Sequence, residues 1–166
     1  MAARIEMEAI IVIGIIALGL FVAAFVTKRR FGLLGLALAA GSLLSGIWGY
    51  DAGLLASAIG VPSSPLSSAI ILSIIVLLPA FLLLFHGYRY KTVFGRLIGA
   101  SLFTILAMTF LIEPISHMLI LQGQALTTYT WLVNNKDLII GAGLIIAVVD
   151  IFLTKPAKPS EKHHEH

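Results

Sequence analysis

The sequence has 166 residues, of which 59% are hydrophobic and only 11% are charged. This charged fraction is roughly half that of a typical soluble domain, and a soluble fold of this length could not bury so much apolar surface. The formal net charge is +3, without a basic stripe interleaved with aromatic residues, which excludes a nucleic-acid-binding surface. The sequence contains no cysteine, so disulfides, thiolate metal sites and thiol catalysis are also excluded.

The basic residues fall into three clusters that are separated by long uncharged runs. The clusters are Lys28, Arg29 and Arg30; Arg89, Lys91 and Arg96; and Lys155, Lys158 and Lys162, with only Arg4 and Lys136 elsewhere. If each apolar run crosses a bilayer once, all three clusters lie on one side, which is the positive-inside pattern. The pattern predicts a multi-pass inner-membrane protein with its amino terminus outside, its carboxyl terminus in the cytoplasm, and basic residues facing anionic lipid headgroups.

The first third of the chain contains two predicted spans. The first covers 9–27, nineteen uncharged residues that approach the ~20 needed to cross the hydrocarbon core. It is interpreted as a retained helix because its basic residues follow the apolar run instead of preceding it. The second covers 31–50, where Trp48 and Asp51 mark an interface. Residues 52–61 are apolar but too short to span, so an interfacial or re-entrant segment is expected there.

The remaining sequence predicts three more spans and one surface helix. The third span covers 66–85 and contains Pro79, which is expected to kink it. The fourth covers about 92–112. The mixed polar and apolar stretch 115–135 is typical of an amphipathic segment on the outer surface. The fifth span covers 138–154. The sequence therefore predicts an all-α, polytopic helical bundle with about five transmembrane helices and an interfacial helix between the fourth and fifth.

The domain organisation is predicted to be simple. Residues 1–154 form a single membrane-embedded helical domain. Residues 155–166 form a basic, histidine-containing tail whose Pro/Lys/Ser/His-rich composition predicts disorder.

Ionisable residues in or near the spans are the default functional candidates, because a charge in hydrocarbon is costly unless it is paired or used. Asp51 and Glu113 lie at predicted outer interfaces, where water and headgroups can solvate them. Asp150 lies about one turn inside the fifth span, and it can pair with Lys155 or Arg96, snorkel to the interface, or serve as a proton site. Arg96 can anchor to inner-leaflet phosphate or pair with Asp150.

His117 follows Glu113 by four residues, the spacing that places two side chains on one helical face. The pair could bind a metal or relay a proton. No second histidine or carboxylate cluster lies nearby in the sequence, however, so neither a metal site nor a cofactor site is predicted. The known catalytic motifs are missing as well, and the sequence predicts a protein that is not an enzyme.

Small residues recur along the second span and its extension, with alternating spacings of four and three. They are Gly35, Ala39, Ser42, Gly46, Gly49, Gly53, Ala56 and Gly60. This period keeps them on one helical face and predicts close contact with a neighbouring helix. Gly95 and Gly99 form a second, shorter pair of the same kind at the start of the fourth span.

Several short motifs resemble the colicin V production protein family of small bacterial inner-membrane proteins. They are the basic turn Lys28-Arg29-Arg30-Phe31-Gly32, the glycine-spaced segment Phe94-Gly95-Arg96-Leu97-Ile98-Gly99, the acidic Glu113 that closes the fourth span, and the amphipathic stretch after it. The resemblance covers roughly residues 5–133. It implies an accessory protein of envelope maintenance or export, needed for toxin production and without a known catalytic site.

The sequence therefore leaves two functions open. The first is a non-enzymatic inner-membrane protein that acts through helix packing and association with a membrane partner or a second copy of itself. The second is a small transport or channel subunit, which requires a polar site between the helices.

Overall fold

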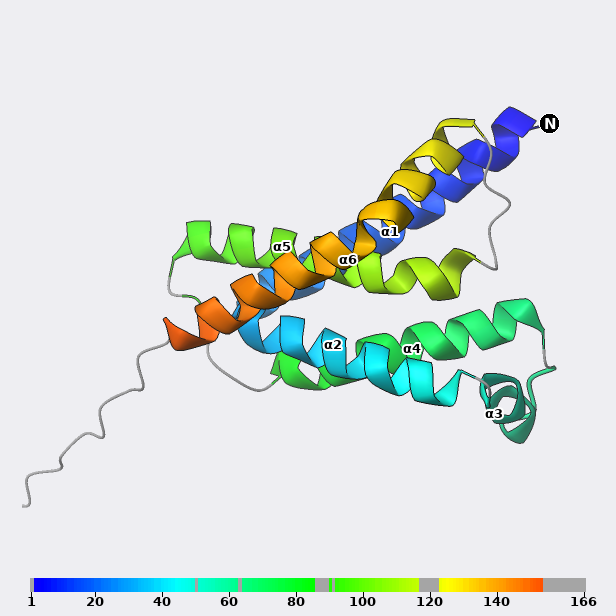
Figure 1. Cartoon of the computed structure of the whole chain (residues 1–166), viewed down its shortest axis with the longest axis horizontal. Helices are drawn as coiled ribbons and strands as arrows, with labels where there is room; N and C mark the ends of the chain where they lie inside the picture. Colours follow the sequence, from blue (N-terminus) through cyan, green and yellow to red (C-terminus); the bar gives the residue numbers. More distant parts are fainter. Residues whose placement is uncertain are drawn as a thin grey trace, which may run out of the picture.

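The structure is a computed structural model that describes residues 2–49, 51–62, 64–85, 90, 92–116 and 123–153. Within these residues the chain forms six α-helices: α1 (Ala2–Thr27), α2 (Phe31–Trp48), α3 (Ala52–Ala58), α4 (Pro65–Phe85), α5 (Val93–Ser116) and α6 (Gly123–Phe152). Five of them, all except α3, are long and apolar enough to cross a membrane. The described part of the chain is an all-α, multi-pass membrane protein, which confirms the predicted fold class (Figure 1).

The centre of the bundle is occupied by α2 and α5. Helix α2 packs against α4, α5 and α6, while α5 packs against α1, α2, α4 and α6. The largest fully buried apolar side chains come from these helices: Phe31, Leu34 and Leu38 on α2, Val76 on α4, and Phe103, Leu106 and Leu111 on α5. Helices α1 and α6 are peripheral, and most of their apolar side chains face outward.

The start of α4 illustrates how local sequence sets a helix boundary. The backbone N–H of Ser67 donates to Ser64 Oγ at 3.1 Å, and the N–H of Ser64 donates to Ser67 Oγ at 2.8 Å. This reciprocal arrangement caps the helix, and Pro65 occupies the first position, where its missing N–H costs nothing. Pro79 lies inside α4, which continues to Phe85.

The short segment after α2 forms a helix of its own. Helix α3 covers seven residues and packs on α4. It is too short to span a membrane, as predicted for residues 52–61.

The last helix contradicts the prediction of a separate interfacial helix before the fifth span. Helix α6 has 30 residues and runs without interruption from Gly123 to Phe152. At 1.5 Å per residue it is about 45 Å long, so it must tilt or project to fit a hydrocarbon core of about 30 Å. The polar stretch 134–137 does not break it, because Asn, Lys and Asp cost a helix only a few tenths of a kcal/mol each.

The small-residue face predicted along α2 is wrong in its outer half. A side chain at Gly46 or Gly53 would meet nothing within 4 Å, and Gly49 faces only carbonyls of its own segment. The helix also ends at Trp48, so Gly53 belongs to α3. Ser42 is only half-buried. Of the predicted positions, Gly35 lies in a tight contact, where a Cβ would stand 3.0 Å from Ala147 Cβ.

The closest backbone approach of α2 is made at Gly41, which the spacing pattern did not select. A Cβ there would stand 2.1 Å from the carbonyl oxygen of Val76 on α4. A Cβ at Gly32 would stand 2.5 Å from the carbonyl oxygen of Ala147 on α6. Glycine is thus required on two sides of α2, because this helix is packed between α4 and α6.

Candidate functional site

The first basic cluster forms the turn between α1 and α2. Helix α1 ends at Thr27, and Lys28 has φ of 59°, in the left-handed region that commonly terminates helices. Arg30 is extended, with φ −74° and ψ 136°, and its side chain does not cap α2. The N–H groups at the start of α2 therefore need partners from elsewhere in the chain.

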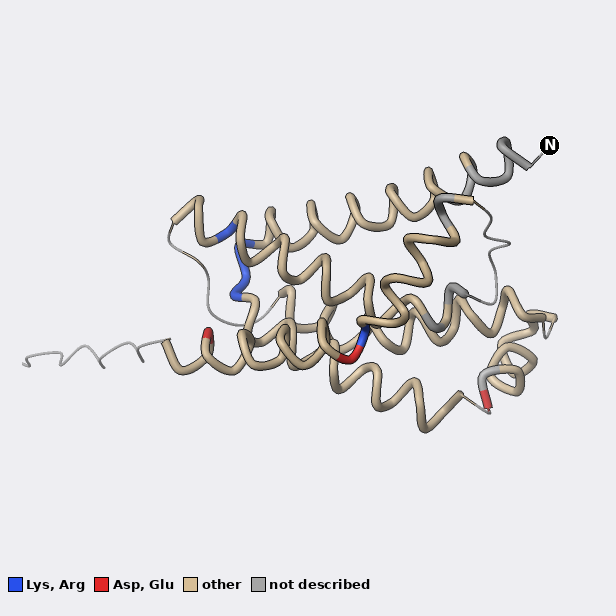
Figure 2. The backbone as a smooth tube through the Cα atoms, turned by 45° about the horizontal axis from the view of Figure 1, so that its top comes forward, with Lys and Arg blue, Asp and Glu red and all other residues tan. Residues whose placement is uncertain are grey.

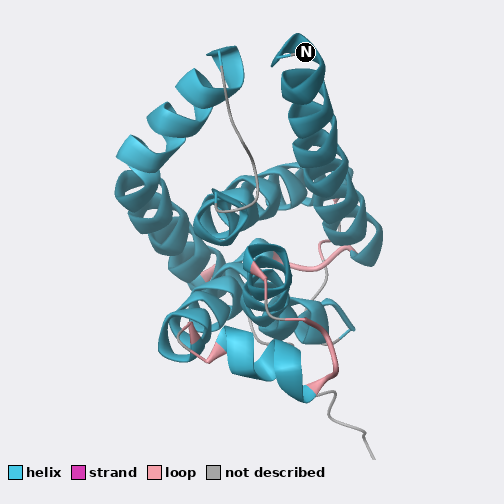
Figure 3. Cartoon of the chain, turned by 90° about the vertical axis from the view of Figure 1, so that its right-hand side faces the viewer, coloured by secondary structure: helices cyan, strands magenta, loops and turns pink. Residues whose placement is uncertain are grey.

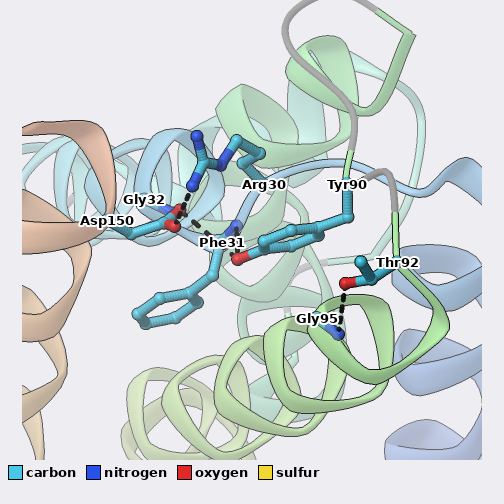
Figure 4. Close-up of polar contacts among 7 residues, drawn as sticks. All are labelled: Arg30, Phe31, Gly32, Tyr90, Thr92, Gly95 and Asp150. Atoms are coloured by element: carbon cyan, nitrogen blue, oxygen red, sulfur yellow. Dashed lines mark hydrogen bonds and ion pairs between the residues drawn. The ribbon is translucent and has the colours of Figure 1, made fainter. Parts of the chain in front are cut away.

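Those partners come from α6 and from the segment before α5 (Figure 4). Asp150 Oδ2 accepts the backbone N–H of Gly32 at 2.9 Å, and Asp150 Oδ1 forms an ion pair of 2.9 Å with Arg30 Nη2. The hydroxyl of Tyr90 accepts the N–H of Phe31 at 3.2 Å and lies 3.4 Å from Asp150 Oδ2. A carboxylate at a helix N-terminus also interacts favourably with the helix dipole.

Tyr90 joins three parts of the fold. Its backbone N–H donates to the carbonyl of Lys28 at 2.8 Å, and its ring lies beneath the Arg30 guanidinium, 5.4 Å from centroid to Cζ. Burial raises the pKa of the Tyr90 phenol, and the Asp150 carboxylate raises it further, while the N–H of Phe31 and the charge of Arg30 act in the opposite direction. The phenol is therefore neutral at physiological pH and can donate to Asp150.

The Tyr90 ring explains the Gly95 and Gly99 pair on α5. A Cβ at Gly95 would stand 3.1 Å from Tyr90 Cδ1, and one at Gly99 would stand 2.5 Å from Tyr90 Cε2. The pair therefore accommodates an aromatic ring, whereas the sequence predicted that it accommodates a neighbouring helix. Thr92 caps the same helix, because its Oγ1 accepts the N–H of Gly95 at 3.2 Å.

Two further arginines bind the ends of other helices. Arg29 Nε donates to the carbonyl of Leu84 at 2.8 Å, and an Nη of Arg29 donates to the carbonyl of Phe85, so it binds the C-terminus of α4. Arg96 donates to the carbonyl of Phe25 at 3.3 Å, near the end of α1, and its Cζ lies 4.7 Å from the centroid of the Phe25 ring. Cations at helix C-termini and over aromatic rings are both stabilising.

We call the seven residues Arg29, Arg30, Gly32, Tyr90, Arg96, Phe25 and Asp150 the charged clamp. It joins the ends of α1, α2, α4, α5 and α6 at one end of the bundle. Beside it lies a hollow of about 320 Å³ lined by Val26, Thr27, Lys28, Arg29, Leu84 and Phe85. Lys28 is exposed there, so the hollow combines a basic rim with apolar walls.

The clamp decides against one alternative that the sequence left open, the pairing of Arg96 with Asp150. Asp150 pairs with Arg30, and Arg96 is bound to Phe25. The reason is geometric: α5 packs closely along α1, which brings Arg96 to the end of α1, whereas α6 packs against α2 at Gly32. The alternative partner Lys155 lies outside the described residues.

Of the other predicted candidates, Asp51 does not join this site. Asp51 is exposed at the start of α3, and its side chain makes no capping hydrogen bond. Glu113 lies in the last turns of α5, and His117 lies outside the described residues. Among the residues that the structure describes, no group of three His, Asp or Glu side chains could hold a metal ion.

Sequence reasoning missed Tyr90 and the structural roles of Arg30 and Gly32. One signal was available for Tyr90: Gly95 and Gly99 follow it by five and nine residues, and paired glycines can accommodate a ring as well as a helix. No comparable signal identifies Arg30, because three adjacent basic residues are equivalent in the sequence and only the packing of α6 selects one of them.

A second polar group lies in the middle of α6. Asn134 and Asp137 are exposed, and Lys136 is half-buried. The candidate span of α6 covers Leu126–Phe152, so these three residues lie within it, apart from the basic residues that Figure 2 shows at one end of the bundle. The sequence placed these residues in the outer connection, but the continuous helix carries them into the span.

Comparison of the chain with protein-family models, with curated proteins and with solved structures gave no match.

Proposed function

We propose that this multi-pass membrane protein is a non-enzymatic component of a bacterial inner membrane that acts through helix packing and association with a membrane partner. Its role belongs to envelope maintenance or export, as in the colicin V production proteins that its short motifs resemble. The amino terminus lies outside and the carboxyl terminus in the cytoplasm, because the basic clusters then face inward.

The observation that carries this proposal is the contrast between the clamp and α6. In the clamp, the arginine and aspartate side chains bind helix ends and one another, so their chemistry is used to hold the fold together. On α6, by contrast, polar side chains within the span are exposed. A rigid bundle with an exposed polar surface inside the membrane has the form expected of a protein that binds another membrane protein.

The hollow beside the clamp supports contact with anionic lipid headgroups. Lys28 and Arg29 supply its positive charge, and Val26 and Phe85 supply apolar walls at the level where a headgroup meets its acyl chains. Basic pockets between helices on the cytoplasmic side are the type of site that binds anionic lipids.

Co-purification from native membranes in mild detergent, followed by mass spectrometry, tests partner association. The wild-type chain should retain a partner protein or a second copy, and a chain with Asn134→Leu and Asp137→Leu should lose it. A chain with Ile15→Ala, altered on the exposed face of α1, is the matched control and should retain it. Recovery of the wild type as a lone monomer from native membranes would contradict the proposal.

Reporter fusions test the orientation separately. A reporter after Lys155 should be active only in the cytoplasm, and one after Gln122 only outside. The opposite result at both positions would reverse the topology.

A small transport or channel subunit is the second candidate, and the position of Lys136 and Asp137 within α6 favours it, because ionisable residues inside a span often line an ion or proton path. Proteoliposomes distinguish the two functions. Association alone predicts no proton or cation flux above that of protein-free vesicles. Flux that is abolished by Asp137→Asn would establish the transport function instead.

A further inference from the structure

The hollow beside the clamp lies where two of the spans end. It has a volume of about 320 Å³ and is lined by Val26, Thr27, Lys28, Arg29, Leu84 and Phe85. The candidate span of α1 ends at Thr27 and that of α4 ends at Phe85, so the hollow lies where the hydrocarbon core meets the headgroups. Its volume is at the lower end of the range of about 300–1,000 Å³ for small-molecule sites. It can therefore hold a lipid headgroup but not the acyl chains.

The two cations of the hollow differ in what they bind. Arg29 donates to the carbonyls of Leu84 and Phe85, which offsets the negative end of the α4 dipole. Lys28 is exposed, and its ammonium group has no hydrogen-bond or ion-pair partner among the residues that the structure describes. None of the six described residues that line the hollow is acidic. The charge of Lys28 is therefore left for a ligand.

The backbone at Lys28 is strained for a residue with a side chain. Its φ of 59° is in the left-handed region, where glycine is the usual residue because a Cβ is disfavoured there. The ammonium group of Lys28 makes no bond within the described fold that a glycine would lose. Because such strain is concentrated at functional positions, the lysine at this turn indicates a use for its side chain outside the fold.

Exposed apolar faces lead from the hollow into the membrane. Val26 is 63% exposed and follows the exposed Val22 by four residues on α1. Phe85 is 73% exposed and follows the exposed Leu82 and Phe81 on α4. Only 11% of the apolar span of α1 is buried, and Figure 3 shows the start of this helix, marked N, projecting beyond the helices beneath it. Acyl chains can therefore lie along both helices below a headgroup in the hollow.

We infer that the hollow binds the phosphate of one anionic phospholipid of the bilayer, with the Lys28 ammonium as its main anchor. Phosphate oxygens accept strong, charge-assisted hydrogen bonds from an ammonium group, and Arg29 adds to the positive potential. The charge of the hollow favours a headgroup without a cation of its own, such as that of phosphatidylglycerol. The ammonium group of phosphatidylcholine would lie beside Lys28 and be repelled.

This inference rests on the lipid contact in the proposed function and specifies its site, its cation and its headgroup. It does not depend on association with a partner protein, because every residue that forms the hollow belongs to one chain.

Native mass spectrometry of the purified chain, with phosphatidylglycerol or phosphatidylcholine added to the detergent, tests the inference. The wild type should retain one phosphatidylglycerol and bind it about 5-fold more tightly than phosphatidylcholine. Lys28→Gln should weaken phosphatidylglycerol binding about 5-fold, and Lys28→Arg should retain it. Lys155→Gln removes one charge from another basic cluster, and as the matched control it should change binding by less than about 2-fold.

Lys28→Gly separates lipid binding from folding. It should lose the lipid as Lys28→Gln does, yet its Tm in lipid-free detergent should equal or exceed that of the wild type, because glycine tolerates the left-handed backbone. A lower Tm would show that the lysine side chain serves the fold and would overturn the inference.

Three other results would also overturn it: equal binding of the two lipids, equal losses in Lys28→Gln and Lys155→Gln, or displacement of the lipid by inorganic phosphate. The first two would indicate a surface without a specific site, and the third a site for free phosphate. A lone monomer from native membranes that retains phosphatidylglycerol would uphold the lipid site and contradict partner association. A partner-bound chain that retains none would do the reverse.

Discussion

Two of the places where this chain carries charge inside or beside its spans are treated in opposite ways. At the clamp, Asp150 is bound by Arg30, Gly32 and Tyr90, and its side chain is only 14% exposed. In the middle of α6, Asp137 is exposed and lacks a hydrogen-bond partner in the described part of the chain. The same residue type is therefore bound within the fold at one site and exposed at the other.

The difference teaches that charge count alone does not locate a functional surface in a membrane protein. The clamp contains more charged residues, yet each of them binds a helix end or another residue of the clamp. The middle of α6 contains fewer, yet Asn134 and Asp137 have no hydrogen-bond partner in the described part of the chain. Stability measurements on the detergent-solubilised monomer should separate the two sites.

The largest effect is expected for Asp150→Ala. It leaves the Arg30 guanidinium without its carboxylate and the Gly32 N–H without an acceptor, and it should lower the free energy of unfolding by about 3 kcal/mol. Asp137→Ala is the control, with an expected change within ~0.5 kcal/mol for the monomer. Denaturant unfolding measures the free energy of unfolding of both variants. Equal losses would show that Asp150 stabilises the fold no more than Asp137 does.

A somewhat smaller loss is expected where α2 meets α4. Gly41→Val places its side chain against the Val76 carbonyl, so the helices must separate, at a cost of about 2 kcal/mol. Gly46→Val, on the open part of the same helix, should change stability by less than about 0.5 kcal/mol. Thermal unfolding in one detergent measures the stability of both variants. A larger loss for Gly46→Val would support the small-residue face that the sequence predicted.

Tyr90→Phe should cost about 1 kcal/mol at neutral pH, because the N–H of Phe31 loses its acceptor while the ring stays on Gly95 and Gly99. Tyr129→Phe on α6 is a matched control. A change in Tyr90→Phe no larger than that of the control would show that the hydroxyl does not cap α2.

The same phenol predicts a pH dependence. Because the pKa of Tyr90 is raised in the folded protein, folding retains the proton that the unfolded chain releases near pH 10.0. The contribution of the neutral phenol is complete below pH 10.0 and is lost as the pH rises through the raised folded-state value. The stability difference between wild type and Tyr90→Phe should therefore shrink above pH 10.0. A difference that stays constant or grows there contradicts this assignment.

The smallest effect is an expected absence of coupling between Arg96 and Asp150. In a double-mutant cycle, Arg96→Gln and Asp150→Asn should add within about 0.5 kcal/mol, since the two side chains have separate partners. Arg30→Gln with Asp150→Asn should show coupling above that level. Strong coupling in the first cycle would instead support the Arg96–Asp150 pairing that the sequence left open.

Hydropathy and signals such as Pro65 predict the membrane class and a short segment after α2. They also predict the helix boundaries at residues 31, 48, 65 and 85 to within two residues. The predicted division of residues 123–152 into a surface helix and a span is wrong, because Asn, Lys and Asp do not end a helix. The single domain over 1–154 and the disordered tail stay predictions.

The sequence by itself determined what depends on the local chain: apolar run length against bilayer thickness, helix caps, and the gathering of basic residues at alternate ends of the spans. Only the tertiary structure decided that Asp150 binds Arg30, that Gly41 faces α4, and that Gly95 and Gly99 hold the Tyr90 ring. Those facts depend on how each helix is rotated and which helix lies beside it. Both are set by the packing of many side chains at once, and a hydrophobic run does not record them.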